Sequence, residues 1–129
     1  MGIELKMLAW SIALAIVMLV VAVLASISQR GIPWALGPRD GTPGLLTGMA
    51  GRLDRSFRNM IETFPLFAAA VLAVVATSHT SENTALGAQL YFWARVAYVP
   101  GYLLGVPLVR TLIWGVSMAG VVLVLAALF

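Results

Sequence analysis

Four long apolar runs take up most of the chain, and they constrain its fold more than any other feature. Each run holds about 20 residues, the length that an α-helix needs to cross the hydrocarbon core of a bilayer. The runs lie at residues 7–28, 60–78, 86–104 and 108–129. Backbone groups in lipid must form hydrogen bonds within their own segment, so the runs are expected to be helical. The sequence therefore predicts an all-α integral membrane protein, one domain over residues 1–129 that forms a four-transmembrane-helix bundle.

The composition excludes several other classes of protein. Hydrophobic residues make up 61% of the 129 residues and charged residues only 10%, against about 45–50% and about 25% in soluble domains. So short a chain has too little interior to bury that much apolar surface in water. A soluble domain, a disordered chain and a nucleic-acid-binding module are therefore excluded. With no Cys and a single His, we expect neither disulfides nor a metal site.

The first run could instead be the core of a signal peptide. Lys6 precedes it, and Val23-Leu24-Ala25 is a tolerable cleavage site. However, the run is longer than the usual core of about 7–15 residues. We therefore expect a retained span.

The basic residues predict the orientation of the spans. The connector at residues 30–57 is rich in glycine and proline and carries Arg30, Arg39, Arg52 and Arg55. Basic residues gather on the cytoplasmic side of a membrane. We therefore expect this connector and the turn at Pro107 to face the cytoplasm, and both termini to face the other side. In a bacterium the membrane would be the plasma or inner membrane.

A polar stripe enters the second run from its cytoplasmic end. At 100° per residue, Arg55, Asn59 and Glu62 lie within about 60° of one another, and Arg58 lies on their flank. Arg55 and Arg58 alone could anchor the helix end by extending their charged groups to the membrane surface, with Glu62 as a salt-bridge partner. Such anchoring does not explain why Asn59 and Glu62 continue the same line one turn deeper.

The third run carries a second stripe, formed by Tyr91, Arg95, Tyr98 and Tyr102 at helical spacing. These residues share one helix face. The structural interpretation is an interhelical network in which Glu62 neutralises Arg95. Tyr98 and Tyr102 lie nearer the cytoplasmic end and are typical of a binding site.

The fourth run places Arg110 and Thr111 in its first turns, after Pro107. Alone, Arg110 would be an orientation anchor. The three stripes share one depth, however, and together they predict one pocket. The predicted site residues are Arg55, Arg58, Asn59, Glu62, Tyr98, Tyr102, Arg110 and Thr111. Guanidinium groups grip carboxylates bidentately, so the ligand should be anionic, with an ammonium group to suit Glu62. An apolar ligand could reach the pocket from the lipid, and a cyclic oligomer would cover its charges.

Four segments resemble the MAPEG family, the membrane-associated proteins in eicosanoid and glutathione metabolism, over about residues 5–128. The first is similar to the family's Arg-x-x-Arg-Asn-x-x-Glu glutathione signature. The segments are Arg55-Ser-Phe-Arg58-Asn59-Met-Ile-Glu62, the loop pieces Gly37-Pro-Arg39-Asp40 and Gly51-Arg52, Ala94-Arg95-Val-Ala-Tyr98-Val-Pro-Gly-Tyr102, and Val109-Arg110-Thr111.

The resemblance implies a homotrimer that binds glutathione between neighbouring subunits near the cytoplasmic side. Arg55 and Arg58 would hold its negative groups, Asn59 and Glu62 its backbone and amino end, and Tyr98, Tyr102 and Thr111 would complete the cleft. Arg110 matches the arginine that stabilises the thiolate in catalytic members. The implied function is a glutathione transferase, with possible peroxidase activity, that acts on hydrophobic electrophiles.

Two departures from the family pattern narrow the activity that the resemblance implies. Trp114 stands where several catalytic members have Tyr, and Tyr98 stands where some eicosanoid-forming members have His. Prostaglandin or leukotriene synthesis is therefore not expected. A non-catalytic protein of the same fold that binds lipid or another ligand stays open as the alternative. A small multidrug exporter is disfavoured, because residues 7–28 carry no acidic residue.

Overall fold

The computed structural model describes residues 1–41 and 44–129, and its regular structure there is entirely helical. Four helices are long and one is short. They are α1 (Ile3–Arg30), α2 (Ile32–Leu36), α3 (Gly48–Ala76), α4 (Glu82–Leu103) and α5 (Pro107–Ala126).

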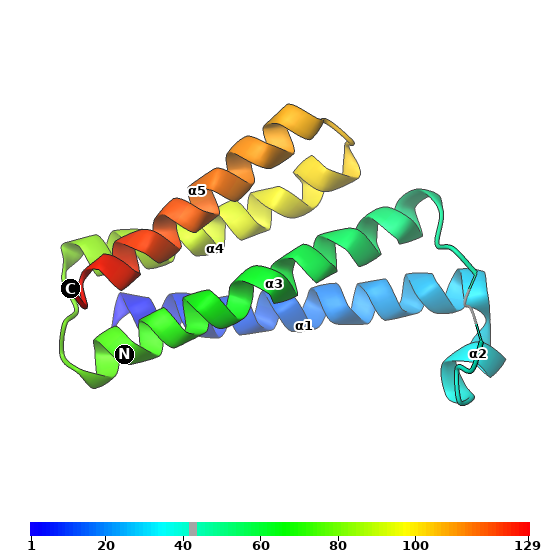
Figure 1. Cartoon of the computed structure of the whole chain (residues 1–129), viewed down its shortest axis with the longest axis horizontal. Coiled ribbons are helices and arrows are strands. Elements are labelled where there is room, and N and C mark those ends of the chain that lie inside the picture. Colours follow the sequence, from blue (N-terminus) through cyan, green and yellow to red (C-terminus); the bar gives the residue numbers. More distant parts are fainter. Residues whose placement is uncertain (42–43) are drawn as a thin grey trace.

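The four long helices lie side by side as two antiparallel pairs, α1 with α3 and α4 with α5 (Figure 1). Both termini and the turn between α3 and α4 lie at one end of the bundle. The connector between α1 and α3 and the turn between α4 and α5 lie at the other end. Near the termini the α4–α5 hairpin packs against the first pair, and it diverges from α3 toward the connector end.

The helix α3 begins twelve residues before the predicted second span, so the prediction of a loop over residues 30–57 was wrong for much of that segment. Glycine and proline suggested turns, but a helix forms here, with one contact inside α3 and one to α4. Arg58 Nε lies 3.1 Å from Asp54 Oδ2, an i,i+4 ion pair. Two residues before Asp54, Arg52 donates a hydrogen bond of 2.8 Å to the carbonyl of Leu103 at the end of α4. Residues 42–43 of the predicted loop lie outside the described part of the chain.

The core lies where α3 and α4 face each other near the termini. The rings of Phe67 and Tyr91 stack with their centroids 4.0 Å apart. The Tyr91 hydroxyl also lies 3.1 Å from Thr63 Oγ1, so its polar end is satisfied inside the bundle. Val71 and Val74 are fully buried beside this pair.

Two glycines bring the backbones of α4 and α5 into direct contact. A Cβ atom added to Gly120 would lie 2.5 Å from the carbonyl oxygen of Gly87, and the reverse contact would be 2.6 Å. Small residues allow such close approach between membrane helices. This contact fixes the α4–α5 hairpin at the end where it joins the core.

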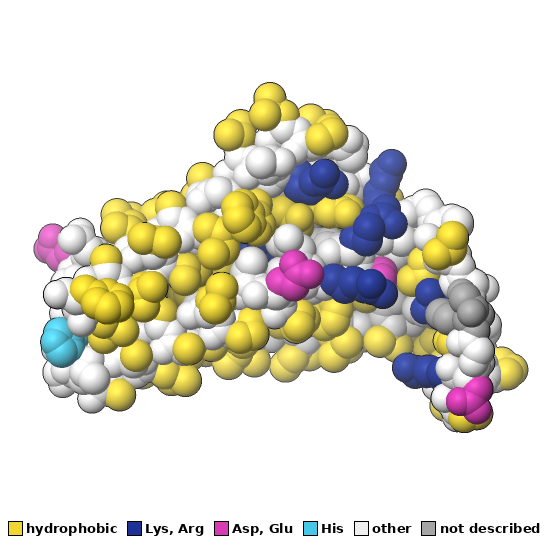
Figure 2. Space-filling view, viewed as in Figure 1, with side chains coloured by type: hydrophobic (Ala, Val, Ile, Leu, Met, Phe, Trp, Pro, Cys, Tyr) yellow, Lys and Arg dark blue, Asp and Glu magenta, His cyan; other side chains and the backbone are white. Residues whose placement is uncertain are grey.

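In the part of the chain that the structure describes, three helices are long and apolar enough to cross a membrane, namely α1, α3 and α5. The predicted third span corresponds to α4, which falls short of that measure because Gln89, Arg95 and three tyrosines interrupt its apolar residues. Large apolar side chains cover much of the outer surface (Figure 2). That surface suits lipid rather than water as the solvent.

Candidate functional site: a basic groove beside the α4–α5 hairpin

Side chains from three helices line one groove of about 340 Å³, which we call the basic groove. Its lining is Arg55, Arg58, Asn59 and Glu62 of α3, Tyr98 and Tyr102 of α4, and Arg110 of α5. Figure 2 shows Lys and Arg side chains gathered in the hollow beside the α4–α5 hairpin, with acidic side chains close by. The structure thus brings together seven of the predicted site residues.

The eighth, Thr111, lies in an adjoining recess of about 230 Å³, the side recess. This space shares Asn59, Tyr98 and Arg110 with the basic groove and adds Thr111 and Trp114. The Thr111 hydroxyl donates a hydrogen bond of 3.0 Å to the carbonyl of Pro107. Thr111 therefore helps to close the first turn of α5, in addition to lining the side recess.

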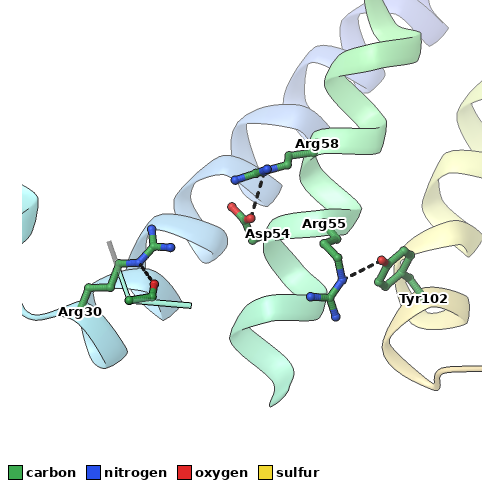
Figure 3. A network of polar contacts seen from close by, with 6 residues as sticks. Arg30, Asp54, Arg55, Arg58 and Tyr102 are labelled. Carbon is green, nitrogen blue, oxygen red and sulfur yellow. Dashed lines mark hydrogen bonds and ion pairs between the residues drawn. The ribbon is translucent and has the colours of Figure 1, made fainter. Parts of the chain in front are cut away.

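The helical register explains why the α3 residues share the groove. Arg55, Asn59 and Glu62 follow one face of α3, as their spacing predicted. Arg55 Nε donates a hydrogen bond of 3.0 Å to the Tyr102 hydroxyl, which links α3 to α4 (Figure 3). Arg58 turns toward Asp54 instead (Figure 3) and is 72% exposed at its side chain.

Tyr102 is the common neighbour of two guanidinium groups. The Arg110 guanidinium carbon lies 4.8 Å from the centre of its ring, and that of Arg55 lies 5.9 Å away. Tyr98, one helical turn earlier, has its ring centre 5.7 Å from that of Tyr102. Both phenols therefore form the α4 wall of the groove.

The side chain of Asn59 carries an unpaired polar atom. Asn59 Oδ1 is buried and has no hydrogen-bond partner among the described residues. Buried polar atoms are normally paired, so an orphan in a groove marks a place for a ligand donor. Asn59 lines both the basic groove and the side recess.

Arg95 does not pair with Glu62, and the prediction of that ion pair was wrong. Its guanidinium lies 4.3 Å from the centre of the Tyr98 ring, and its three nitrogens have no hydrogen-bond partner among the described residues. Arg95 is 1% exposed, whereas Glu62 faces the open groove. The buried cation therefore lies against an aromatic ring and does not line the groove.

Two contacts near the groove escaped the sequence analysis. The Asp54–Arg58 ion pair was signalled by its i,i+4 spacing. The bond from Arg52 to the carbonyl of Leu103 had no sequence signal, because it depends on how α3 and α4 pack. Both contacts order the connector end of the groove.

The groove has the chemistry of an anion site. Its lining holds three arginines and one carboxylate, that of Glu62, together with two phenols and one amide. Arginine is the side chain best shaped to hold carboxylates. Within residues 1–41 and 44–129, no three His, Cys, Asp or Glu side chains are placed to hold a metal ion.

Comparison with known proteins identifies the family. Searches of the curated proteins and of the solved structures return no match to the chain. The family model described as the MAPEG family matches residues 7–129, nearly the whole chain. Together with the membrane-spanning helices, this match shows that the chain is an integral membrane protein that belongs to the MAPEG family.

Proposed function

We propose that this protein is a membrane-bound glutathione transferase, with peroxidase activity toward lipid hydroperoxides, that acts on hydrophobic electrophiles. One observation carries the proposal: α3, α4 and α5 line a single groove with three arginines, one carboxylate, one amide and two phenols. Glutathione has two carboxylates, an ammonium group and two amide bonds. Its charges therefore complement the charges of the groove.

In this proposal Arg55 and Arg58 bind the carboxylates of glutathione. Glu62 binds its ammonium group, and Asn59 accepts a hydrogen bond from its peptide backbone through the orphan Oδ1. Tyr98, Tyr102 and Thr111 complete the walls, so the thiol end would lie near Arg110, where the basic groove joins the side recess.

Arg110 is the proposed catalytic residue. A free thiol has a pKa of about 8.5, and only the thiolate attacks electrophiles efficiently. A guanidinium beside the sulfur favours the thiolate. The sulfur then attacks the electrophilic carbon, a carbon–sulfur bond forms, and the leaving group departs with its electron pair. Binding both reactants in one groove supplies much of the acceleration.

The open side of the groove favours an oligomer. Arg55, Arg58 and Glu62 are exposed in the single chain, which would leave their charges against lipid if nothing covered them. A homotrimer with a site between each pair of neighbours would cover these charges. In that assembly α4 is the fourth membrane span, screened by its neighbours. In this proposal the connector end lies in the cytoplasm and both termini lie on the other side, as the positive residues of the connector favour.

The test uses the purified protein in liposomes with glutathione and a chlorinated nitroarene. We expect conjugation that saturates with glutathione and that falls by about 100-fold or more in Arg110→Ala, if Arg110 acts as an electrostatic stabiliser. The matched control is Arg39→Ala, because Arg39 does not line the groove and donates a hydrogen bond of 3.0 Å to the carbonyl of Ala35. Equal rates for the native protein and a folded Arg110→Ala variant would contradict the role of Arg110.

A non-catalytic binding protein of the same fold is the second candidate. Trp114 favours it, because this residue places an indole in the side recess beside Arg110, where it offers no hydroxyl to a sulfur. Calorimetry separates the two candidates. Glutathione binding with thiolate absorbance supports the transferase, whereas binding of an acidic lipid without thiol chemistry supports the second candidate.

A further inference from the structure

An apolar cavity of about 330 Å³ lies between α1, α3 and α4, away from the basic groove. The residues that line the cavity include Val17 and Val21 of α1, Ser56 of α3, and Val96, Val99 and Pro100 of α4. It shares no residue with the basic groove or the side recess. On both α3 and α4 the cavity uses a different helix face from the groove, and none of the described residues that line it is charged.

The size and walls of the cavity suit a small lipophilic molecule. Small-molecule sites have volumes of about 300–1,000 Å³, and this cavity is at the lower end of that range. Val17 and Val21 are 58% and 40% exposed, so the space opens toward the lipid, and its walls lack part of their dispersion contacts within the protein. A molecule with a short hydrocarbon chain would restore those contacts.

Two polar groups in these walls lack their usual partners. The Ser56 side chain is 0% exposed, and its hydroxyl has no hydrogen-bond partner among the described residues. Pro100 has no amide hydrogen, so the carbonyl of Val96 lacks the donor that an uninterrupted helix would supply. The same apolar cavity is therefore bordered by an unused hydroxyl and by a carbonyl that has lost its helical bond.

We propose that this cavity binds a lipophilic alcohol. The hydrocarbon chain fills the space between the valines, and the alcohol's hydroxyl donates to the Val96 carbonyl. The Ser56 hydroxyl donates in turn to the alcohol oxygen. A plain acyl chain would leave both polar groups unpaired, and an anion would find no cation in the walls. The proposal does not depend on glutathione chemistry, because the cavity and the basic groove have separate linings.

The test is photolabelling of the protein in phospholipid vesicles. The probe is an eight-carbon alcohol that carries a diazirine, and labelled residues are mapped by mass spectrometry of peptides. We expect the label at residues 14–21 and 96–100, and competition by unlabelled octanol. Val99→Phe, which fills the cavity with a ring, should abolish labelling there. Thermal unfolding of each variant shows whether it is folded.

The hydroxyl contact has its own test. Ser56→Ala should weaken labelling about fivefold, the effect of one neutral hydrogen bond. Ser117→Ala is the matched control, because the buried Ser117 hydroxyl already donates to the Trp114 carbonyl at 2.6 Å and lies outside the cavity. Equal labelling by a diazirine hydrocarbon without the hydroxyl would show a groove for acyl chains and overturn the proposal. Labelling spread over the outer helix faces and unaffected by Val99→Phe would also overturn it.

Discussion

The guanidinium carbon of Arg110 lies 4.8 Å from the centre of the Tyr102 ring. The hydroxyl of the same tyrosine accepts a hydrogen bond of 3.0 Å from Arg55. One side chain of α4 therefore orients cations from both α3 and α5. Because a guanidinium that is already oriented loses less side-chain entropy when it binds, this arrangement prepares the groove for an anion.

Tyr102→Phe removes the hydroxyl but keeps the ring beneath Arg110. We expect the KM for glutathione to rise about fivefold, since one hydrogen bond to Arg55 is lost, while kcat changes little. Tyr102→Leu removes both contacts and should also lower kcat, because Arg110 loses its aromatic support. Steady-state kinetics in liposomes measure both constants. Equal effects of the two variants on kcat would contradict a separate role for the ring.

Glu62→Gln tests the ammonium contact in the proposed complex. We expect glutathione to bind at least about tenfold more weakly, since the ammonium group then faces an uncharged amide in place of a carboxylate. Calorimetry should show that a glutathione analogue without the amino group binds both proteins equally. Glu82→Gln is the matched control, because Glu82 lies in the first turn of α4 at the opposite end of the bundle.

Gly120→Ala tests the close contact between α4 and α5. The new Cβ would lie 2.5 Å from the Gly87 carbonyl oxygen and 2.8 Å from the Tyr91 amide nitrogen. Both are backbone atoms, so the helices must separate, at a cost of about 1–3 kcal/mol. Gly115→Ala is the control on the same helix, because no atom lies within 4 Å of its added Cβ. Denaturant titration in detergent should show a lower free energy of unfolding for Gly120→Ala but not for Gly115→Ala.

Helical periodicity predicted which site residues share a helix face, but not the contacts between helices around the site. The spacing of Arg55, Asn59 and Glu62 depends on one helix alone, and these residues share the groove as expected. The early part of α3 also contacts a second helix, through the hydrogen bond from Arg52 to the carbonyl of Leu103. A pattern within one segment carries no information about such a contact.

The apolar cavity and the surroundings of Arg95 escaped prediction for the same reason. Each depends on how far the helices stand apart, which is set by packing of the whole bundle. The cavity has walls from three helices. Arg95 and Glu62 carry opposite charges, yet the Arg95 guanidinium lies beside the Tyr98 ring, whereas Glu62 lines the groove.

The last prediction concerns the unpaired cation of Arg95. A cation–π contact such as that with Tyr98 contributes about 1–2 kcal/mol, whereas placing an arginine at mid-membrane depth costs about 2.5–3.5 kcal/mol. The cost is the larger of the two, so Arg95→Met, which keeps most of the volume without the charge, should raise the free energy of unfolding by about 1 kcal/mol. Tyr91→Phe serves as the comparison, because it breaks the contact with Thr63 and should lower that free energy by about 1 kcal/mol. Denaturant titration measures both changes, and a marked loss of stability in Arg95→Met would mean that the assembled protein supplies Arg95 with an anionic partner.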